Sequence, residues 1–329
     1  MEKPVRHHVL DEVDLGLIES LREDGRMALG ELGRRVGLSG DAARERLRRL
    51  REAGIVRVQA RVDPAVLGYD TLAMVLLTVR GNVAKVAERL VEVEEIDTVV
   101  TVAGSADLLL EFVCRDDEHL NELLDTHVRG SEEIDGRSVL VYLEVLKDTT
   151  GEDAIGSGTR PTGAKPLDDV DRAVLAALQR DGRASYQDVA DHTGLSYSHA
   201  RRRAVALIES QTVRIETSVN RISQGRVVAA VGVRTQGPIG PVRDVLLSLD
   251  EVQFAVATAG PFDLVIDVAC RDRARLVELV LHELRMAPGI SATEIFLYLE
   301  LRKLPLWWSG LVRQPDSIGE RPAPAVDPS

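Results

Sequence analysis

Arginines gather in two short segments of this chain. The segment GLSGDAARERLRRL at 37–50 sets Arg44, Arg46, Arg48 and Arg49 within six residues. The segment GLSYSHARRRAVAL at 194–207 repeats the layout, with Arg201, Arg202 and Arg203 in a row. Arginine forks pair with guanine edges, and arginines neutralise phosphates. The whole chain has a formal charge of −12, so these two segments indicate local contact with a polyanion at two places on the protein.

The acidity lies away from the arginine segments. Residues 61–150 hold 8 Lys/Arg and 19 Asp/Glu, whereas residues 1–60 hold 12 and 11 and residues 151–226 hold 11 and 10. Long-range attraction to a polyanion is therefore weak, but a local basic face remains available.

The chain is a tandem duplication of a unit of about 150 residues. Residues 10–56 match residues 167–213 with 17 identities in 47 positions. VAGSADLLLEFVCRD at 102–116 then pairs with TAGPFDLVIDVACRD at 258–272. The stretch between the copies, 149–166, is rich in Gly, Thr and Pro, which is typical of a flexible linker.

Each unit begins with a pattern of three helices. Val13, Leu17, Ile18 and Leu21 share one helical face, and Asp24-Gly25 ends that helix. A short second helix follows, and Gly37-Leu38-Ser39 makes a tight turn in which Ser39 caps the third helix. In that third helix Ala43, Leu47 and Leu50 face inward, so Arg44, Arg48 and Arg51 point outward.

The rest of each unit alternates strands and helices in the order β-α-β-β-α-β, the ferredoxin-like arrangement. The predicted fold class is α+β, with two tandem units, each a three-helix winged or helix-turn-helix head followed by a ferredoxin-like body. The predicted domains are head 1 at 1–60, body 1 at 61–148, a linker at 149–166, head 2 at 167–219, body 2 at 220–304 and a tail at 305–329.

A glycine turn followed by an arginine-bearing third helix is typical of a helix-turn-helix reader of double-stranded DNA. The alternative is a merely solvated charged face, which a lone segment would favour. Repetition of the whole head favours DNA instead. The predicted DNA-contacting residues are Ser39, Gly40, Asp41, Arg44, Arg48 and Arg49 in head 1, and Ser196, Tyr197, Ser198, His199, Arg201 and Arg202 in head 2.

The ordered motifs resemble those of the Lrp/AsnC (feast/famine) transcription regulators. They are L-D-x-x-D at 10–14, D-G-R at 24–26, G-L-S at 37–39, R-x-x-x-L at 46–50, G-I-V at 54–56 and A-G-x-x-D at 103–107. The resemblance implies that the heads bind DNA. It also implies that the bodies, called RAM domains, dimerise and bind a small effector, commonly an amino acid. One chain then looks like two fused protomers.

The second copy departs from the first. It reads Gln211-Thr212-Val213 in place of G-I-V, and Ala204 replaces Leu47. The helix starts also differ, with Gly40-Asp41 against Tyr197-Ser198. We expect the two heads to prefer different half-sites. A second hypothesis is that head 2 binds weakly or has drifted.

A loop in each body is the predicted effector site. A glycine allows close backbone approach, nearby amides could hold a carboxylate, and the loop aspartate could take an ammonium group. Composition alone favours a plain hairpin connection with an Asp turn residue, but the resemblance favours the effector. The loop residues are Gly104, Ser105, Ala106 and Asp107 in body 1, and Gly260, Pro261, Phe262 and Asp263 in body 2.

Composition sets further expectations. At 44% hydrophobic and 29% charged residues, with no apolar run of 18 and no export signal, the chain reads as a cytoplasmic protein without a membrane partner. Cys114 and Cys270 read as buried structural thiols, and the spacing of His119 and His127 suits no metal, so neither metal nor cofactor is predicted. Trp307-Trp308 are expected to pack on body 2, and the tail after residue 312 to be disordered.

Three functions compete. The leading prediction is a DNA-binding regulator and no enzyme. Siroheme decarboxylases share the domain pair, but an anionic tetrapyrrole calls for histidine and arginine in the body. The bodies here are acidic and their strands lack histidine. The third is a ligand-sensing assembly protein that no longer touches DNA. A homo-oligomer is expected, with the two bodies pairing either with each other or with those of another chain.

Overall fold

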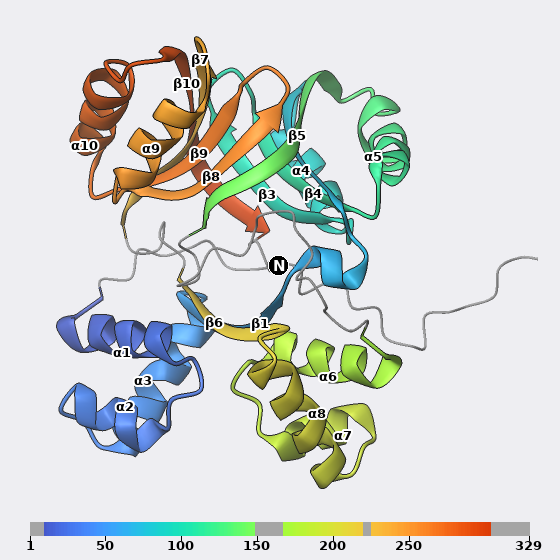
Figure 1. Cartoon of the computed structure of the whole chain (residues 1–329), viewed down its shortest axis with the longest axis vertical. Coiled ribbons are helices and arrows are strands. Elements are labelled where there is room, and N and C mark those ends of the chain that lie inside the picture. The colour runs from blue at the N-terminus through green and yellow to red at the C-terminus, as the bar shows by residue number, and fades with distance from the viewer. Residues whose placement is uncertain (1–9, 149–166, 220–224, 304–329) are drawn as a thin grey trace, which may run out of the picture.

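The computed structural model describes residues 10–148, 167–219 and 225–303 (Figure 1). The predicted linker, Trp307-Trp308 and the tail lie outside the described residues. Each unit contains a three-helix head and a β-α-β-β-α-β body, as the sequence predicts. The head helices are α1 (Glu12–Glu23), α2 (Leu29–Arg35) and α3 (Gly40–Glu52) in head 1, and α6 (Asp169–Arg180), α7 (Tyr186–Thr193) and α8 (Tyr197–Glu209) in head 2.

The first helix of each head starts at an aspartate cap. Asp11 accepts a hydrogen bond from the Asp14 amide, and the Asp14 side chain accepts one from the Asp11 amide. Asp168 and Asp171 make the same capping box in head 2. The two aspartates of the L-D-x-x-D motif therefore fix where the helix begins.

One strand leaves each head, and the two strands pair as an antiparallel ribbon. These strands are β1 (Val56–Val62) and β6 (Val213–Val219), with Gln59 opposite Glu216 at the centre. Ala60 and Val62 of β1 belong to the hydrophobic core of head 2, whereas Ile215 and Val219 of β6 pack against the core of head 1. Each head thus lies below the body of the other unit (Figure 1).

The two bodies form one closed eight-stranded barrel with the strand order β10-β3-β4-β2-β5-β8-β9-β7. The bodies therefore pair within the chain, which decides between the two arrangements left open by the sequence. Body 1 contains η1 (Pro64–Leu67), β2 (Thr71–Val79), α4 (Val83–Val91), β3 (Ile96–Ala103), β4 (Leu108–Cys114), α5 (Asp117–Leu124), η2 (Asp125–Arg129) and β5 (Ile134–Asp148). Body 2 contains β7 (Val227–Thr235), α9 (Gly240–Ser248), β8 (Val252–Ala259), β9 (Leu264–Cys270), α10 (Arg273–Glu278), η3 (Leu279–Leu284) and β10 (Ile290–Lys303).

The barrel has an apolar interior to which both bodies contribute. Leu76 and Ala106 of body 1 are matched in body 2 by Gly232 and Phe262, all at equivalent positions. A Cβ on Gly232 would lie 2.7 Å from the Phe262 ring. Body 1 therefore has its larger residue on the strand, and body 2 has its larger residue on the loop. This exchange conserves volume in a close-packed interior.

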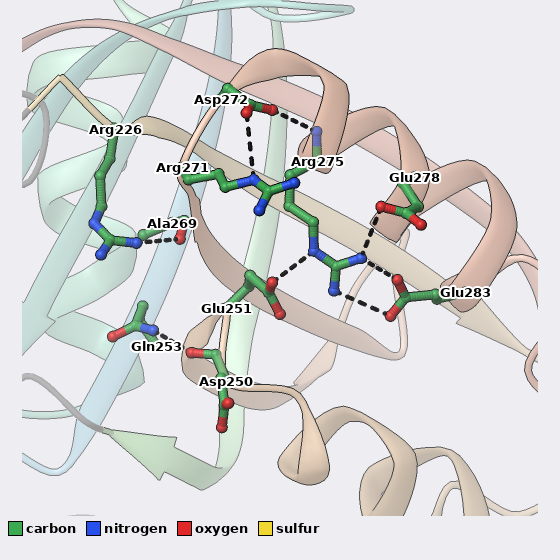
Figure 2. A network of polar contacts seen from close by, with 10 residues as sticks. All are labelled: Arg226, Asp250, Glu251, Gln253, Ala269, Arg271, Asp272, Arg275, Glu278 and Glu283. Carbon is green, nitrogen blue, oxygen red and sulfur yellow. Dashed lines mark hydrogen bonds and ion pairs between the residues drawn. The ribbon is translucent and has the colours of Figure 1, made fainter.

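The contacts of the outer helices with the residue that precedes β3 or β8 also differ between the copies. Figure 2 shows Arg275 of α10, whose Nε donates to Glu251 at 2.6 Å and whose guanidinium also meets Glu278 and Glu283. At the equivalent position in body 1, His119 Nε2 lies 3.7 Å from Glu95. His119 thus has a structural partner at this junction.

Both cysteines are fully buried, as expected. Burial raises the pKa of the Cys114 thiol to about 12 and that of Cys270 to about 11. In the described ranges, no helix combines the length and apolar character needed to cross a bilayer.

Candidate nucleic-acid interface and effector loops

Two arginines lock the heads together by reciprocal contacts. Arg26 Nη1 donates to the Gly182 carbonyl at 2.6 Å and Nη2 to the Ala184 carbonyl at 2.9 Å. Arg183 returns the contact to the Gly25 carbonyl at 2.6 Å and the Met27 carbonyl at 2.7 Å. These are the arginines of the D-G-R motif, so the motif joins the two heads.

The glycine of the same motif allows the opposite strand to approach. A Cβ on Gly182 would lie 2.8 Å from the Gln59 amide nitrogen, and one on Gly25 3.0 Å from a methyl group of Ile215. Arg51 of α3 adds an ion pair to Asp181 at 2.8 Å. The two heads are therefore held together as one unit at the same end of the barrel (Figure 1).

Helix α3 presents the predicted arginines of head 1 to solvent. Ser39 caps this helix by accepting from the Ala42 amide, as expected, and Gly37 has the left-handed φ of 72°. The side chains of Arg44, Arg48 and Arg49 are 65%, 53% and 62% exposed. Gly40 approaches Gly30 of α2 closely, because an added Cβ would lie 3.2 Å from its Cα.

Every one of these arginines has an acidic partner on the same helix. Arg44 pairs with Asp41 at 2.8 Å. Arg48 pairs with Glu45 at 2.6 Å and Glu52 at 2.5 Å, while Arg49 lies 3.7 Å from Glu45. Hydrogen bonds to Glu45 and Glu52 raise the pKa of Arg48, and the hydrogen bond from Arg48 in turn lowers the pKa of Glu45.

Helix α8 presents a different surface in head 2. Tyr197, Ser198, Arg201 and Arg202 are exposed, and His199 is half-buried. The exposed Ser196 precedes the helix but makes no side-chain capping bond, and its hydroxyl lies 3.4 Å from that of Ser198. The Arg201 guanidinium lies 5.9 Å from the Tyr186 ring centroid.

One arginine of each helix has a role that sequence reasoning missed. Arg46 donates to Asp11 at 2.6 Å and Asp14 at 2.8 Å. Arg203 reaches Asp168 at 2.9 Å and Asp171 at 3.0 Å. These arginines tie the third helix to the first, and the signal was the joint presence of L-D-x-x-D and the R-x-x-x-L arginine.

The predicted effector loops lie where the two bodies meet. A Cβ on Gly104 would lie 2.6 Å from the Ile295 carbonyl oxygen of β10, and one on Gly260 2.9 Å from the Val139 carbonyl oxygen of β5. Ser105 donates to Glu294 across this junction. The loops therefore contact the last strand of the opposite body.

Much of each loop serves the fold. The Asp107 carboxylate accepts from the Val79 amide at 2.8 Å, and Asp263 accepts from the Thr235 amide at 2.7 Å. Ala106 and Phe262 are buried, whereas Pro261 is exposed and its carbonyl accepts from Arg234. Within the described residues, no three His, Cys, Asp or Glu side chains gather as a metal site would require.

Comparison with known proteins assigns the family. The AsnC-type helix-turn-helix domain matches residues 10–51 and 167–208, and the Lrp/AsnC ligand-binding domain matches residues 72–152 and 228–305. The chain belongs to the Lrp/AsnC family of transcription regulators. It is a regulator of this type with two helix-turn-helix domains and two ligand-binding domains in tandem.

Single-unit relatives align with less than half of this Lrp/AsnC chain. It is 36% identical over 144 residues to the HTH-type transcriptional regulator FL11 of Pyrococcus furiosus, which covers 43% of this chain and 95% of FL11. It is 29% identical to the regulator Ptr1 of Methanocaldococcus jannaschii, covering 43% of this chain and 96% of Ptr1.

A solved structure resembles the whole tandem arrangement. The crystal structure of the siroheme decarboxylase NirDL superposes with a TM-score of 0.61, covering 92% of this chain and 98% of NirDL. The two are only 14% identical, so the likeness is one of fold alone.

This Lrp/AsnC regulator also carries two acids inside the barrel that the sequence did not single out. Glu111 of β4 accepts from the Tyr142 hydroxyl at 2.7 Å and the Thr98 hydroxyl at 2.6 Å. Asp267, at the equivalent place in β9, accepts from the Tyr298 hydroxyl at 2.9 Å. Burial, and then the charge of Glu111, raise the pKa of Asp267 to about 7. Burial also raises the pKa of Glu111.

A buried ion cluster joins the ribbon of this Lrp/AsnC regulator to its barrel on one side. Arg61 of β1 pairs with Asp148, the last residue of β5, and with Glu216 of β6 at 2.9 Å. The Arg61 and Asp148 side chains are 3% and 1% exposed. Ser218 occupies the position equivalent to Arg61 in the second copy, so the pairing is asymmetric.

Proposed function

We propose that the chain is a sequence-specific DNA-binding regulator in which both heads contact one duplex. The observation that carries this proposal is the reciprocal Arg26 and Arg183 lock, which supports two solvent-facing third helices on one end of the molecule (Figure 1). A helix fits the major groove, and two linked helices read two half-sites. The predicted contacts are Ser39, Gly40, Asp41, Arg44, Arg48 and Arg49 of head 1 and Ser196, Tyr197, Ser198, His199, Arg201 and Arg202 of head 2.

The test is binding of the full chain to a randomised duplex library, followed by titration of the selected sequence at several salt concentrations. We expect a selected operator with two unlike half-sites and an affinity that falls steeply with salt. A perfectly palindromic operator would contradict the expected difference between the heads. No binding at low salt would instead favour the ligand-sensing assembly protein.

The effector proposal concerns the loops 104–107 and 260–263, where the bodies meet. Loop amides and the exposed Ser105 supply polar groups suited to a small molecule such as an amino acid. We expect one of the twenty amino acids to raise the melting temperature of the full chain. No shift with any of them would leave the loops as structural connections.

The regulator is also proposed to act in the cytoplasm, without enzymatic activity, and as a homo-oligomer. Glu111 and Asp267 place two carboxyl groups in the otherwise apolar barrel interior, which disfavours an anionic tetrapyrrole. An absorbance titration with siroheme tests this, and a saturable spectral change would favour the decarboxylase alternative.

Leu143 of β5 and Leu299 of β10, the last strand of each body, are 65% and 56% exposed and suit contact with further copies of the chain. Light scattering should then give the Leu143→Asp/Leu299→Asp variant a lower molar mass than the wild type.

A further inference from the structure

The two third helices offer DNA different electrostatic surfaces, one neutral and one positive, although each carries a cluster of arginines. On the exposed face of α3, Arg44, Arg48 and Arg49 are balanced by Asp41, Glu45 and Glu52. On α8 the exposed charged residues are Arg201, Arg202 and Glu209. The face of α3 therefore sums to zero and that of α8 to +1.

The arginines of α8 are also unneutralised. In the parts of the chain that the structure describes, neither Arg201 nor Arg202 has a carboxylate partner. Glu45 occupies the position equivalent to Arg202, so the sign of the charge reverses between the heads. Exposed ion pairs such as Arg48–Glu45 are weak and exchange easily, but the carboxylate stays on the helix and repels phosphates.

Head 2 has a positioning residue that head 1 lacks. The Tyr186 ring of α7 lies 5.9 Å from the guanidinium of Arg201 and 5.1 Å from that of Arg26. The equivalent residue in head 1 is Leu29. An aromatic face attracts a guanidinium without neutralising its charge, so Arg201 is oriented and stays available to DNA.

We propose that head 2 anchors the regulator on DNA through Arg201 and Arg202, positioned by Tyr186, whereas head 1 contributes mainly selectivity. At the matched position, Arg202 pairs with guanine and Glu45 accepts from the amino group of cytosine. This inference rests on the proposed function, and it reverses the expectation that head 2 has drifted. The operator then differs between its half-sites at the base pair that these two residues face.

The experiment measures affinity and salt dependence of the full chain on its selected operator for matched variants of the two heads. We expect R201A/R202A to lose at least about tenfold in affinity and to bind with a shallower salt slope, because phosphate and guanine contacts disappear. R44A/R48A is expected to lose less than about threefold, because carboxylates already oppose those arginines. E45R should raise affinity and R202E should lower it.

The positioning role is tested by Y186L, which copies head 1, against Y186F, which keeps the ring. Loss of affinity in Y186L with retention in Y186F is expected, with melting temperature and circular dichroism as folding checks. Equal losses in R44A/R48A and R201A/R202A would overturn the assignment of head 2 as the anchor while leaving DNA binding intact. A wild-type chain that binds no DNA would overturn the proposed function itself.

Discussion

Arg26 and Arg183 join the two heads of this protein by reciprocal hydrogen bonds, in which each guanidinium binds two backbone carbonyls of the other head. The contact is intramolecular because both protomer-like units are on one chain. Burial, followed by repulsion from Arg26, lowers the pKa of Arg183, so close approach of the two cations opposes the hydrogen bonds. The lock persists because the carbonyl groups satisfy both guanidinium groups.

Replacing both arginines should weaken the contact between the two heads. R26A/R183A removes four hydrogen bonds from charged donors, so we expect unfolding to become easier by roughly 2–5 kcal/mol. Affinity for the full operator should fall more than affinity for a single half-site, because the heads are no longer prealigned. Denaturant unfolding and titration of both duplexes measure these effects. R34A, which removes only the exposed pair with Glu31, serves as the control, and an equal effect there would contradict the lock.

Gly182 is expected to tolerate no side chain. In G182A the new Cβ would lie 2.8 Å from the Gln59 amide nitrogen, and strand β1 cannot move without disturbing the ribbon. We expect a loss of about 1–3 kcal/mol in unfolding free energy. G30A is the matched control, because nothing lies within 4 Å of its added Cβ and the helix gains propensity. Equal melting temperatures for the two variants would refute this account of the turn.

Gln211 has a backbone conformation that suits glycine. Its φ is 56°, and Gly54 at the equivalent place in head 1 has a φ of 67°. Because a side chain costs about 1–2 kcal/mol in the left-handed region, Q211G should stabilise the chain and G54A should destabilise it. Thermal melting should show a higher melting temperature for Q211G and a lower one for G54A. A lower melting temperature for Q211G would show that the Gln211 side chain contributes more than the strain removes.

The exchange of volume between the bodies can be tested as a double-mutant cycle. Phe262→Ala leaves a cavity and should cost about 3–5 kcal/mol, while Gly232→Leu alone should clash with the Phe262 ring. The double variant restores the Leu and Ala pair of body 1. We therefore expect a favourable coupling of at least about 1 kcal/mol from denaturant unfolding. Additive losses would mean that the two residues do not share one space.

Asp267 should make stability depend on pH. Its folded pKa of about 7 lies above the ordinary value of 3.8, so its protonated form is the one that the barrel favours. The folded state then binds more protons than the unfolded state across this window, and the unfolding free energy falls as the pH rises from 3.8 to about 7. The slope is at most about 1.4 kcal/mol per pH unit.

The matched variant D267N keeps the shape and cannot ionise. Its melting temperature should drop less than that of wild type between pH 5 and pH 8. The control is T258S of β8, which keeps the hydroxyl that donates to the Phe262 carbonyl and cannot titrate in this range. Parallel melting curves for wild type and D267N across that range would exclude Asp267 as the titrating group.

Periodicity and repetition were enough to derive the local fold of each unit. Leu17, Leu21, Leu47 and Leu50 repeat at helical spacing, so burying them on one side defines the head and leaves Arg44 and Arg48 outside. The cap at Ser39 and the order of strands and helices follow from equally local rules. These features are predictable because contacts within a few residues determine them.

The sequence by itself determined two copies of a three-helix head and an α/β body, each with an arginine-bearing third helix. Tertiary structure alone decided that the bodies close one barrel, that Arg26 and Arg183 exchange carbonyl contacts, and that Arg61 meets Asp148 and Glu216. These residues are far apart along the chain, and side-chain spacing carries no information about which distant backbone they meet. The pairing of β1 with β6 brings them together, because each strand begins in the core of its own head and ends against the core of the opposite head.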